Sequence, residues 1–319
     1  MRKITLILLG LALIFLLWML HKVGWDTIWQ HLLRVGWWWP VLLLPYGIVS
    51  WIEAISWDYL LLSPAHRPSL TLLFRLRLSG EALNTMTPTA GLGGEPFKAA
   101  HLAASGVPWE EATASVVIHK GIAVLSLVLY IFLGLALVPF LLPLDSSLVW
   151  LLSLGAFLLA SGALIFIILQ GRSPCVQGIR ILERFGLCPR RLKEKERDLE
   201  SLDTQMATFY REHPGRGLLS LALYFLAWIV HALEVYLIFW FLGHPISLGL
   251  AVCLDALAMI FTAMGFLIPA SLGVQDGGNV LLALGFHLGA TLGATFSILR
   301  RLREAFWMGL GLLLAVRGK

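Results

Sequence analysis

Long apolar stretches, separated by shorter polar ones, dominate the pattern of hydrophobic and polar positions along the chain. Six of these stretches approach or exceed the length of about 20 residues that a helix needs to cross a bilayer. They lie at residues 4–20, 39–62, 110–139, 148–169, 217–242 and 289–316. Because the apolar residues are continuous rather than alternating with polar ones, helices are favoured over a β-barrel. The pattern predicts an all-α polytopic membrane protein with about six spanning helices.

The composition supports this class and argues against several functions. The 319-residue chain is 58% hydrophobic and only 13% charged, whereas soluble domains are about 25% charged. Its three cysteines show no CxxC spacing, so neither a zinc site nor a disulfide framework is indicated. There is no GxxxxGK(S/T) motif, which argues against direct ATP hydrolysis. We expect no metal, no cofactor and no nucleic-acid partner, and a role other than that of an enzyme.

The N-terminal segment 1–38 is predicted to form a span and an interfacial helix. Met1, Arg2 and Lys3 precede the apolar residues 4–20, and no small-residue cleavage site follows, so the span should remain uncleaved. Residues 22–38 mix tryptophans with a few charged residues, a composition typical of a helix that lies in the membrane interface.

Two similar helix-breaking sequences lie inside the hydrophobic regions, at residues 88–95 and 269–276. Each has a proline seven residues before a carboxylate, with glycine between them. A broken helix is tolerated at membrane depth only where the break is buried in protein or lines a cavity. We interpret residues 69–105 and 247–286 as re-entrant helical hairpins. Their predicted helices lie at residues 70–86, 95–105, 247–268 and 274–286.

The two breaks belong to an internal repeat, in which one constant and ungapped offset aligns the second half of the chain with the first. Four pairs match: Glu53 with Glu234, Pro88 with Pro269, Glu95 with Asp276, and Lys120 with Arg301. We assign residues 39–139 to repeat A and residues 217–316 to repeat B, with the N-terminal span and the connecting span 148–169 as additions. Three crossings separate the repeats, which predicts the inverted arrangement of many secondary transporters, with a substrate site between the halves.

The topology follows from the basic residues. Residues 171–217 hold ten Lys and Arg residues and seven Asp and Glu residues, and residues 190–206 have the composition of a solvated helix. Positively charged loops stay on the cytoplasmic side. We therefore predict that the basic loop 171–217 and both termini are cytoplasmic, in the cell (inner) membrane of a prokaryote.

Ionisable residues at membrane depth cost roughly 2.5–3.5 kcal/mol each on insertion scales, so each is a functional hypothesis. Glu95 and Asp276 each open a short helix, where an acid either caps the helix or binds a substrate cation or proton. Gly93, Gly94 and Gly273 would allow a ligand to approach the backbone, and helix N-termini suit a phosphate. Both interpretations of the acids remain open.

The cations of the last span, with Lys120, are the complementary candidates. Lys120 and Arg301 occupy equivalent positions in the repeats and would hold an anionic headgroup. A purely structural Arg–Glu pair is the alternative on the same helical face. Substrate-binding candidates are Glu81, Asn84, Gly93, Gly94, Glu95, Lys120, Gly273, Asp276, Arg300 and Arg301. Candidates for charge pairing or coupling are Glu53, Glu234, Arg303 and Glu304.

Several motifs resemble the flippase-like membrane domain of the lysylphosphatidylglycerol synthase/flippase superfamily. They are Gly80-Glu-Ala-Leu-Asn84, Thr87-Pro88, Gly93-Gly-Glu-Pro96, Gly106-Val107, His119-Lys120, Ile268-Pro-Ala-Ser-Leu-Gly-Val-Gln-Asp276-Gly-Gly278 and Leu299-Arg-Arg-Leu-Arg303. The resemblance covers nearly the whole chain and implies an inverted-repeat domain that moves lipids between leaflets. In multidomain members this domain flips a lipid with a lysyl headgroup. By position, the resemblance implicates Glu95, Asp276, Arg300, Arg301 and Arg303, with Glu81 and Asn84 nearby.

Two features depart from the superfamily pattern. The soluble aminoacyl-transferase domain of the synthases is not expected, since the sequence ends just after the last span. Position 276 is an aspartate where the resemblance implies a glutamate, and its shorter reach would alter the fit of a headgroup.

The expected function is translocation of an anionic or aminoacylated phospholipid, or of a polyisoprenoid-linked lipid, between leaflets. Its expected partner is a lipid with a charged headgroup, with a lipid-synthesising enzyme and a second copy of the chain as further candidates. The alternatives are a membrane-embedded transferase that modifies lipids and a scaffold that docks partners on residues 171–217.

Overall fold

The computed structural model describes a helical membrane domain. Its described residues are 26, 29–30, 33, 35–62, 67–87, 92–141, 150, 153–158, 160–162, 164–165, 196–265 and 268–317. All regular elements in these ranges are helices, which confirms the predicted all-α class. The predicted span 4–20, much of the span 148–169, residues 88–91 of the first break and residues 171–195 of the basic loop lie outside the described residues.

The labelled helices follow one another in the order that the sequence predicts. They are η1 (Gly36–Leu43), α3 (Leu44–Asp58), α4 (Leu70–Met86), α5 (Glu95–Ala104), α6 (Trp109–Leu141), α10 (Glu196–Glu212), α11 (Pro214–Phe241), α12 (Leu248–Met264), η3 (Pro269–Ser271), α13 (Val274–Gly285) and α14 (Ala290–Arg317).

Three helical stretches among the described residues are long and apolar enough to cross a membrane. They are Gly36–Asp58, Trp109–Leu141 and Pro214–Phe241, which contain most of the predicted spans 39–62, 110–139 and 217–242. Helix α14 has 28 residues, and at about 1.5 Å per residue it is also long enough to cross. Its arginines and glutamate lower its apolar character, so its place in the bilayer depends on how its polar face is covered.

The two hairpins are built alike, from a helix of 17 residues, a break and a shorter helix. Ser69 and Ser247 cap the first helix of each hairpin, because their side chains accept the amides of Leu72 and Leu250. A helix of 17 residues spans only about 25 Å, less than the hydrocarbon core of about 30 Å. Local capping and the breaks therefore explain why these helices are short.

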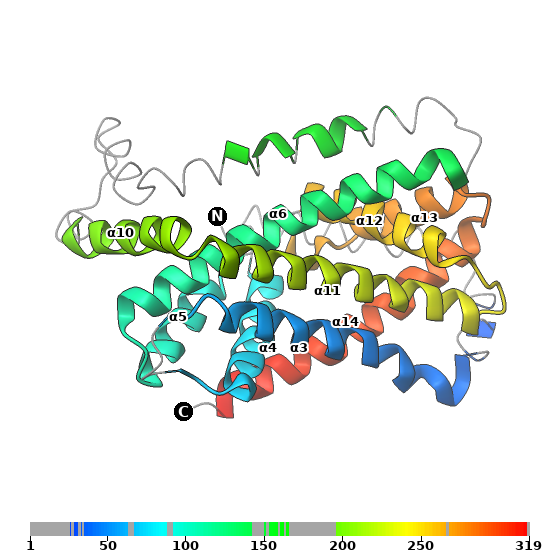
Figure 1. Cartoon of the computed structure of the whole chain (residues 1–319). Coiled ribbons are helices and arrows are strands. Elements are labelled where there is room, and N and C mark those ends of the chain that lie inside the picture. Colours follow the sequence, from blue (N-terminus) through cyan, green and yellow to red (C-terminus); the bar gives the residue numbers. More distant parts are fainter. Residues whose placement is uncertain are drawn as a thin grey trace.

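Corresponding helices of the two halves run in opposite directions (Figure 1). Helix α6 leads away from the α10 end of the molecule and α14 returns to it, and α11 and α3 are opposed in the same way. Helix α4 packs against α14 and α12 packs against α6, while α3 packs against α11. The two halves are therefore interlocked.

The constant, ungapped offset of the internal repeat does not hold throughout. Helices α4 and α12 start at Leu70 and Leu248, which are closer together in the chain than Glu95 and Asp276 are. The register returns at these two acids because the second break is one residue longer and because Asp276 is the third residue of α13, whereas Glu95 is the first residue of α5. The second break contains η3, in which Ala270 and Ser271 adopt left-handed backbone angles (φ 54° and 47°). These backbone angles could not be recognised from residue matches alone.

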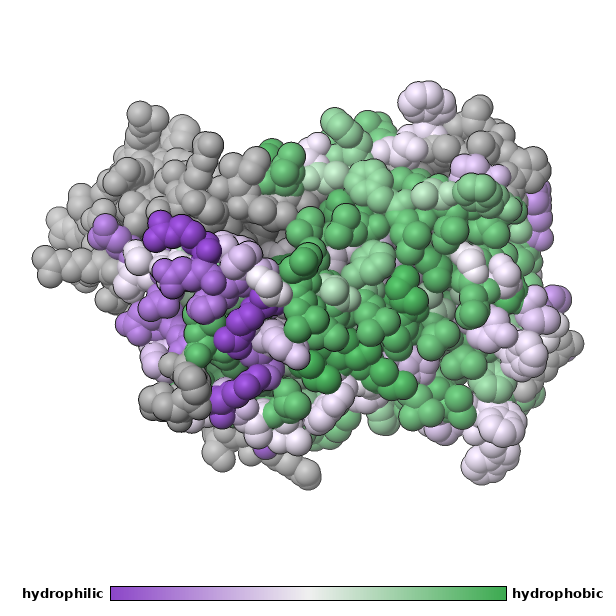
Figure 2. Space-filling model, viewed as in Figure 1, coloured by the Kyte–Doolittle hydropathy of each residue, from purple (hydrophilic) through white to green (hydrophobic). Residues whose placement is uncertain are grey.

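The exterior matches a bilayer environment. Figure 2 shows a broad hydrophobic face over the spanning helices and a hydrophilic region at the α10 end. Large apolar side chains such as Trp37, Phe140 and Trp150 are strongly exposed on the outside, which is unusual for a soluble protein. The spanning helices thus have an apolar exterior, and several of their charged residues, such as Glu53 and Glu234, are buried.

Helix α10 confirms part of the helix that we expected in the basic loop. It begins at Glu196, and its apolar residues Leu202, Met206 and Phe209 are buried. They share one helical face, and Met206 and Phe209 join the core formed with α3, α5 and α6. Only the opposite face of α10 is solvated, so this part of the loop is an integral component of the fold.

Candidate functional site

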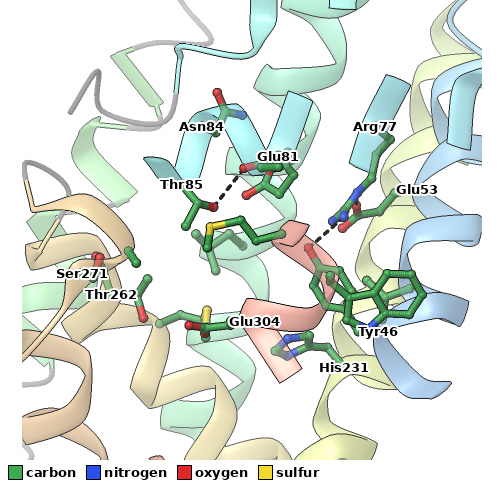
Figure 3. A pocket seen from close by; sticks show the side chains of 18 of the residues that line it. Tyr46, Glu53, Arg77, Glu81, Asn84, Thr85, His231, Thr262, Ser271 and Glu304 are labelled. Carbon is green, nitrogen blue, oxygen red and sulfur yellow. Dashed lines mark hydrogen bonds and ion pairs between the residues drawn. The ribbon is translucent and has the colours of Figure 1, made fainter. Parts of the chain in front are cut away.

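A cavity of about 430 Å³ lies between the two halves. Helices α3, α4 and α6 contribute to its wall from one half, and α11, α12, η3 and α14 contribute from the other. Figure 3 shows polar side chains from these helices around a common space, among them Glu81 and Thr85 on one side and Thr262 and Glu304 on another. A cavity thus lies where the repeats led us to expect a substrate site.

In the first half, an ion pair joins α3 to α4 at the cavity wall. Arg77 Nε donates to Glu53 Oε2, and both side chains are buried. Arg77 Nη1 also donates to Tyr46 Oη (2.9 Å) and Ser50 Oγ (3.1 Å). A buried charge is tolerated when it is paired and hydrogen-bonded. The pair therefore holds α3 and α4 together through buried polar contacts.

The second half has an ion pair on the equivalent glutamate. Arg303 Nε and Nη2 donate to the two carboxylate oxygens of Glu234 at 2.8 and 2.7 Å. The guanidinium carbon of Arg303 lies 4.7 Å from the centre of the Tyr46 ring, and that of Arg77 lies 5.1 Å from it. Tyr46 thus connects the ion pairs of the two halves by cation–π contacts. Pairing with cations, which was one of the two expectations for Glu53 and Glu234, is what the structure shows.

A third cluster surrounds Asp255 of α12, a residue that we did not single out in the sequence. Its carboxylate accepts hydrogen bonds from Arg300 Nη2 (2.8 Å) and Tyr130 Oη (3.0 Å), and it lies 2.8 Å from His231 Nδ1. Asp255 is fully buried. It is the only acid in the apolar segment 247–268, and an isolated acid at membrane depth is a signal that could have identified it.

Asp276 caps α13 and binds α14. Its carboxylate accepts the amide of Gly273 (2.8 Å), the hydroxyl of Ser297 (2.7 Å) and two bonds from Arg301 (3.0 and 2.9 Å). Arg301 also donates to Glu304 (2.8 Å) and to the carbonyl of Ala270 (2.7 Å). These bonds engage Asp276 and Arg301 with the protein itself. Asp276 therefore caps α13, as one of the two interpretations predicted. A contact of Asp276 or Arg301 with a lipid headgroup stays a prediction.

The first break has an analogous but looser cluster. Asn84 accepts the amide of Gly94 (2.7 Å) and donates to Glu95 (3.1 Å), so it ties the break to α4. Glu95 lies 2.6 Å from Lys98 Nζ and 3.7 Å from Lys120 Nζ. Lys120 retains a side-chain exposure of 26% and lines the cavity. Its amine is therefore less committed to the protein than the guanidinium of Arg301.

The described residues contain no group of three His, Cys, Asp or Glu side chains arranged to hold a metal ion.

Comparison with known proteins agrees with a helical membrane domain. Residues 5–312 match the model of the family described as the lysylphosphatidylglycerol synthase TM region. The chain belongs to this family. The match includes both breaks and the arginines of α14, so it extends across both halves of the cavity wall.

Two archaeal members of the UPF0104 group are similar to this chain. A UPF0104 membrane protein of Methanocaldococcus jannaschii is 23% identical over 93% of this chain and 89% of its own length. A second, from Methanothermobacter thermautotrophicus, is 29% identical over 74% of this chain and 71% of its own length. No solved structure matches the chain.

In this member of the lysylphosphatidylglycerol synthase TM family, half of the residues singled out in the sequence line the cavity. These are Glu53, Glu81, Asn84, Lys120, Arg300, Arg303 and Glu304. The others support the wall from behind or shape the breaks: Gly93, Gly94, Glu95, Glu234, Gly273, Asp276 and Arg301. Sequence reasoning omitted Tyr46, Arg77, His231 and Asp255, which build the polar clusters.

Proposed function

We propose that this membrane domain translocates a lipid with a charged headgroup between the two leaflets. The observation that carries the proposal is the charged cavity of about 430 Å³ between two interlocked, oppositely oriented halves whose exterior is apolar. The headgroup passes through the cavity, while the acyl or isoprenoid chains remain in the bilayer. The protein moves the lipid without converting it.

The cavity supplies charged groups that replace water around such a headgroup. Lys120 and Arg300 are the cations of its wall whose donors are least engaged by protein oxygens. Glu81 lines the same cavity and takes part in none of the ion pairs among the described residues. A headgroup with a phosphate and an amine would find an oppositely charged partner for each.

Alternating access follows from the inverted arrangement. Rocking one half against the other would expose the cavity first to one leaflet and then to the other, as in other inverted-repeat transporters. We place the α10 end on the cytoplasmic side, because residues 171–217 carry the largest number of basic residues. The family description, which refers to a lysylphosphatidylglycerol synthase, supports a lipid as the substrate.

Replacing Glu81 with glutamine should slow translocation of an amine-bearing phospholipid about tenfold, because a charge-assisted hydrogen bond is lost. The measurement is a leaflet assay in proteoliposomes with phosphatidylethanolamine and phosphatidylglycerol labelled on an acyl chain. The matched control is Glu200→Gln on the exposed face of α10, which should leave the rate unchanged.

Three outcomes decide the proposal. A wild-type rate no faster than that of protein-free liposomes would reject translocation of these lipids. A rate for Glu81→Gln equal to the wild-type rate would reject the role of Glu81. Conversion of the lipid into a new product, detected by mass spectrometry, would favour a transferase.

A further inference from the structure

Arg300 has donors in the cavity wall that the fold leaves unused. Its Nη2 donates to Asp255 Oδ1 at 2.8 Å. Its Nε and Nη1 are buried and have no acceptor among the described residues. Only 2% of the residue is exposed, and it lines the cavity. The guanidinium also lies near the Phe296 ring, with 5.6 Å between its carbon and the ring centre, which restricts its position.

The other arginines of the polar clusters are engaged more fully. Arg77 donates to a carboxylate and to two hydroxyl groups, and Arg303 makes a two-bond pair with Glu234. Arg301 uses all three of its nitrogens on protein oxygens. Of these four arginines, Arg300 alone keeps two buried nitrogens without a described acceptor. The donors of Arg300 are therefore the least satisfied by the protein.

The carboxylate that faces Arg300 is also shared. Asp255 accepts from Tyr130 and lies at hydrogen-bond distance from His231, so Arg300 is one of three groups around a single acid. A buried donor of a charged group is costly to leave unpaired, and native structures rarely do so without a reason. A ligand that enters the cavity and presents oxygen acceptors would meet this requirement.

We propose that Arg300 is the phosphate receptor of the cavity and that the ligand is recognised through the oxygens of a phosphate ester. The guanidinium group suits phosphate because it offers several fixed donors and a permanent positive charge. Lys120, on the wall of the same cavity, supplies a second positive charge. The internal repeat favoured Arg301 as the principal contact for an anion. We assign this contact to the adjacent Arg300 instead.

The inference rests on the proposed function only in its choice of a lipid as the carrier of the phosphate. Three probes separate the possible sources: dioctanoyl phosphatidylglycerol, dioctanoylglycerol without phosphate, and glycerol 3-phosphate. Binding of each to the purified full chain in a phosphate-free detergent buffer is measured by isothermal titration calorimetry. We expect the phosphate-bearing lipid to bind at least about tenfold more tightly than dioctanoylglycerol.

The decisive variant is Arg300→Lys, which keeps the positive charge next to Asp255 but removes the additional guanidinium donors. Its affinity for the phosphate-bearing lipid should fall at least about tenfold, with little change for dioctanoylglycerol. The control is Arg211→Lys on the exposed face of α10, which should bind as the wild type does.

A second variant distinguishes a loss of phosphate binding from misfolding of the protein. Asp255→Asn removes the protein carboxylate that competes with the ligand for Arg300, so phosphate binding should become tighter. A purely structural role for Arg300 would not produce opposite changes in the two variants. Equal affinity of wild type and Arg300→Lys for the phosphate-bearing lipid would overturn the inference.

The outcomes also separate this inference from the proposed function. Binding that depends on Arg300, without translocation in the leaflet assay, would reject the transport proposal and support the phosphate receptor. Glycerol 3-phosphate binding as tightly as the lipid would support the receptor with a water-soluble phosphate ester as its ligand. Translocation that is unaffected by Arg300→Lys, with unchanged binding, would reject the receptor alone.

Discussion

Replacing Glu234 with leucine should lower the free energy of unfolding by about 3–5 kcal/mol, because it leaves Arg303 buried without its carboxylate partner. Both oxygens of Glu234 accept from Arg303, and the two side chains are almost completely buried. The change can be measured as a shift of the unfolding curve in mixed micelles of dodecyl maltoside and sodium dodecyl sulfate.

The double variant Glu234→Leu with Arg303→Met is the matched control. It removes both charges, so no unpaired charge stays buried, and most of the lost stability should return. If the double variant were less stable than Glu234→Leu, the ion pair could not be the cause of the loss. If it recovers stability but loses translocation, the pair contributes to the shape of the cavity wall as well as to folding.

Replacing Gly94 with alanine should have the second largest effect and prevent the first hairpin from closing. A Cβ atom at this position would lie 2.0 Å from the carbonyl oxygen of Gly80, which is backbone of α4. A flexible side chain could move away, but this helix backbone cannot move without breaking its packing against α14. We expect most of the protein to aggregate, as measured by the monodisperse fraction in size-exclusion chromatography.

Gly309→Ala provides the matched control for this prediction. Nothing lies within 4 Å of a Cβ atom built at Gly309 in α14, and alanine has the higher helix propensity. This variant should elute as the wild type does and be equally or slightly more stable. Normal behaviour of Gly94→Ala would show that the contact between the break and α4 is looser than the structure indicates.

The helices of the hairpins could be predicted closely because their ends depend on local chemistry. Ser69 and Ser247 accept amides only three residues away, and the breaks follow directly from glycine and proline. The internal repeat also identified Glu53 and Glu234, since charged residues are rare in apolar helices. The change of register across α4 and α12 was missed, because it arises in the connection before each helix, which is shorter between α11 and α12 than between α3 and α4.

The partners of these charges could not be predicted in the same way. Glu53 pairs with Arg77 of the next helix, whereas the equivalent Glu234 pairs with Arg303, 69 residues away. Asp255 meets Tyr130, which is 125 residues away in the chain. Such pairs depend on the rotation of each helix and on which helices cross. Residues at equivalent positions of the internal repeat can therefore have ion-pair partners at non-equivalent positions.

The sequence by itself determined the membrane class, the positions of most helices, the two breaks and the presence of charges at membrane depth. These follow from hydrophobicity, capping and backbone restriction, which act over a few residues. Only the tertiary structure decided which charges are already satisfied and which keep unused donors. Arg300 and Arg301 are adjacent in the chain, yet they point to different neighbours because successive residues on a helix face different directions. Arg301 therefore binds the second break, while Arg300 lines the cavity and keeps two buried nitrogens without an acceptor among the described residues.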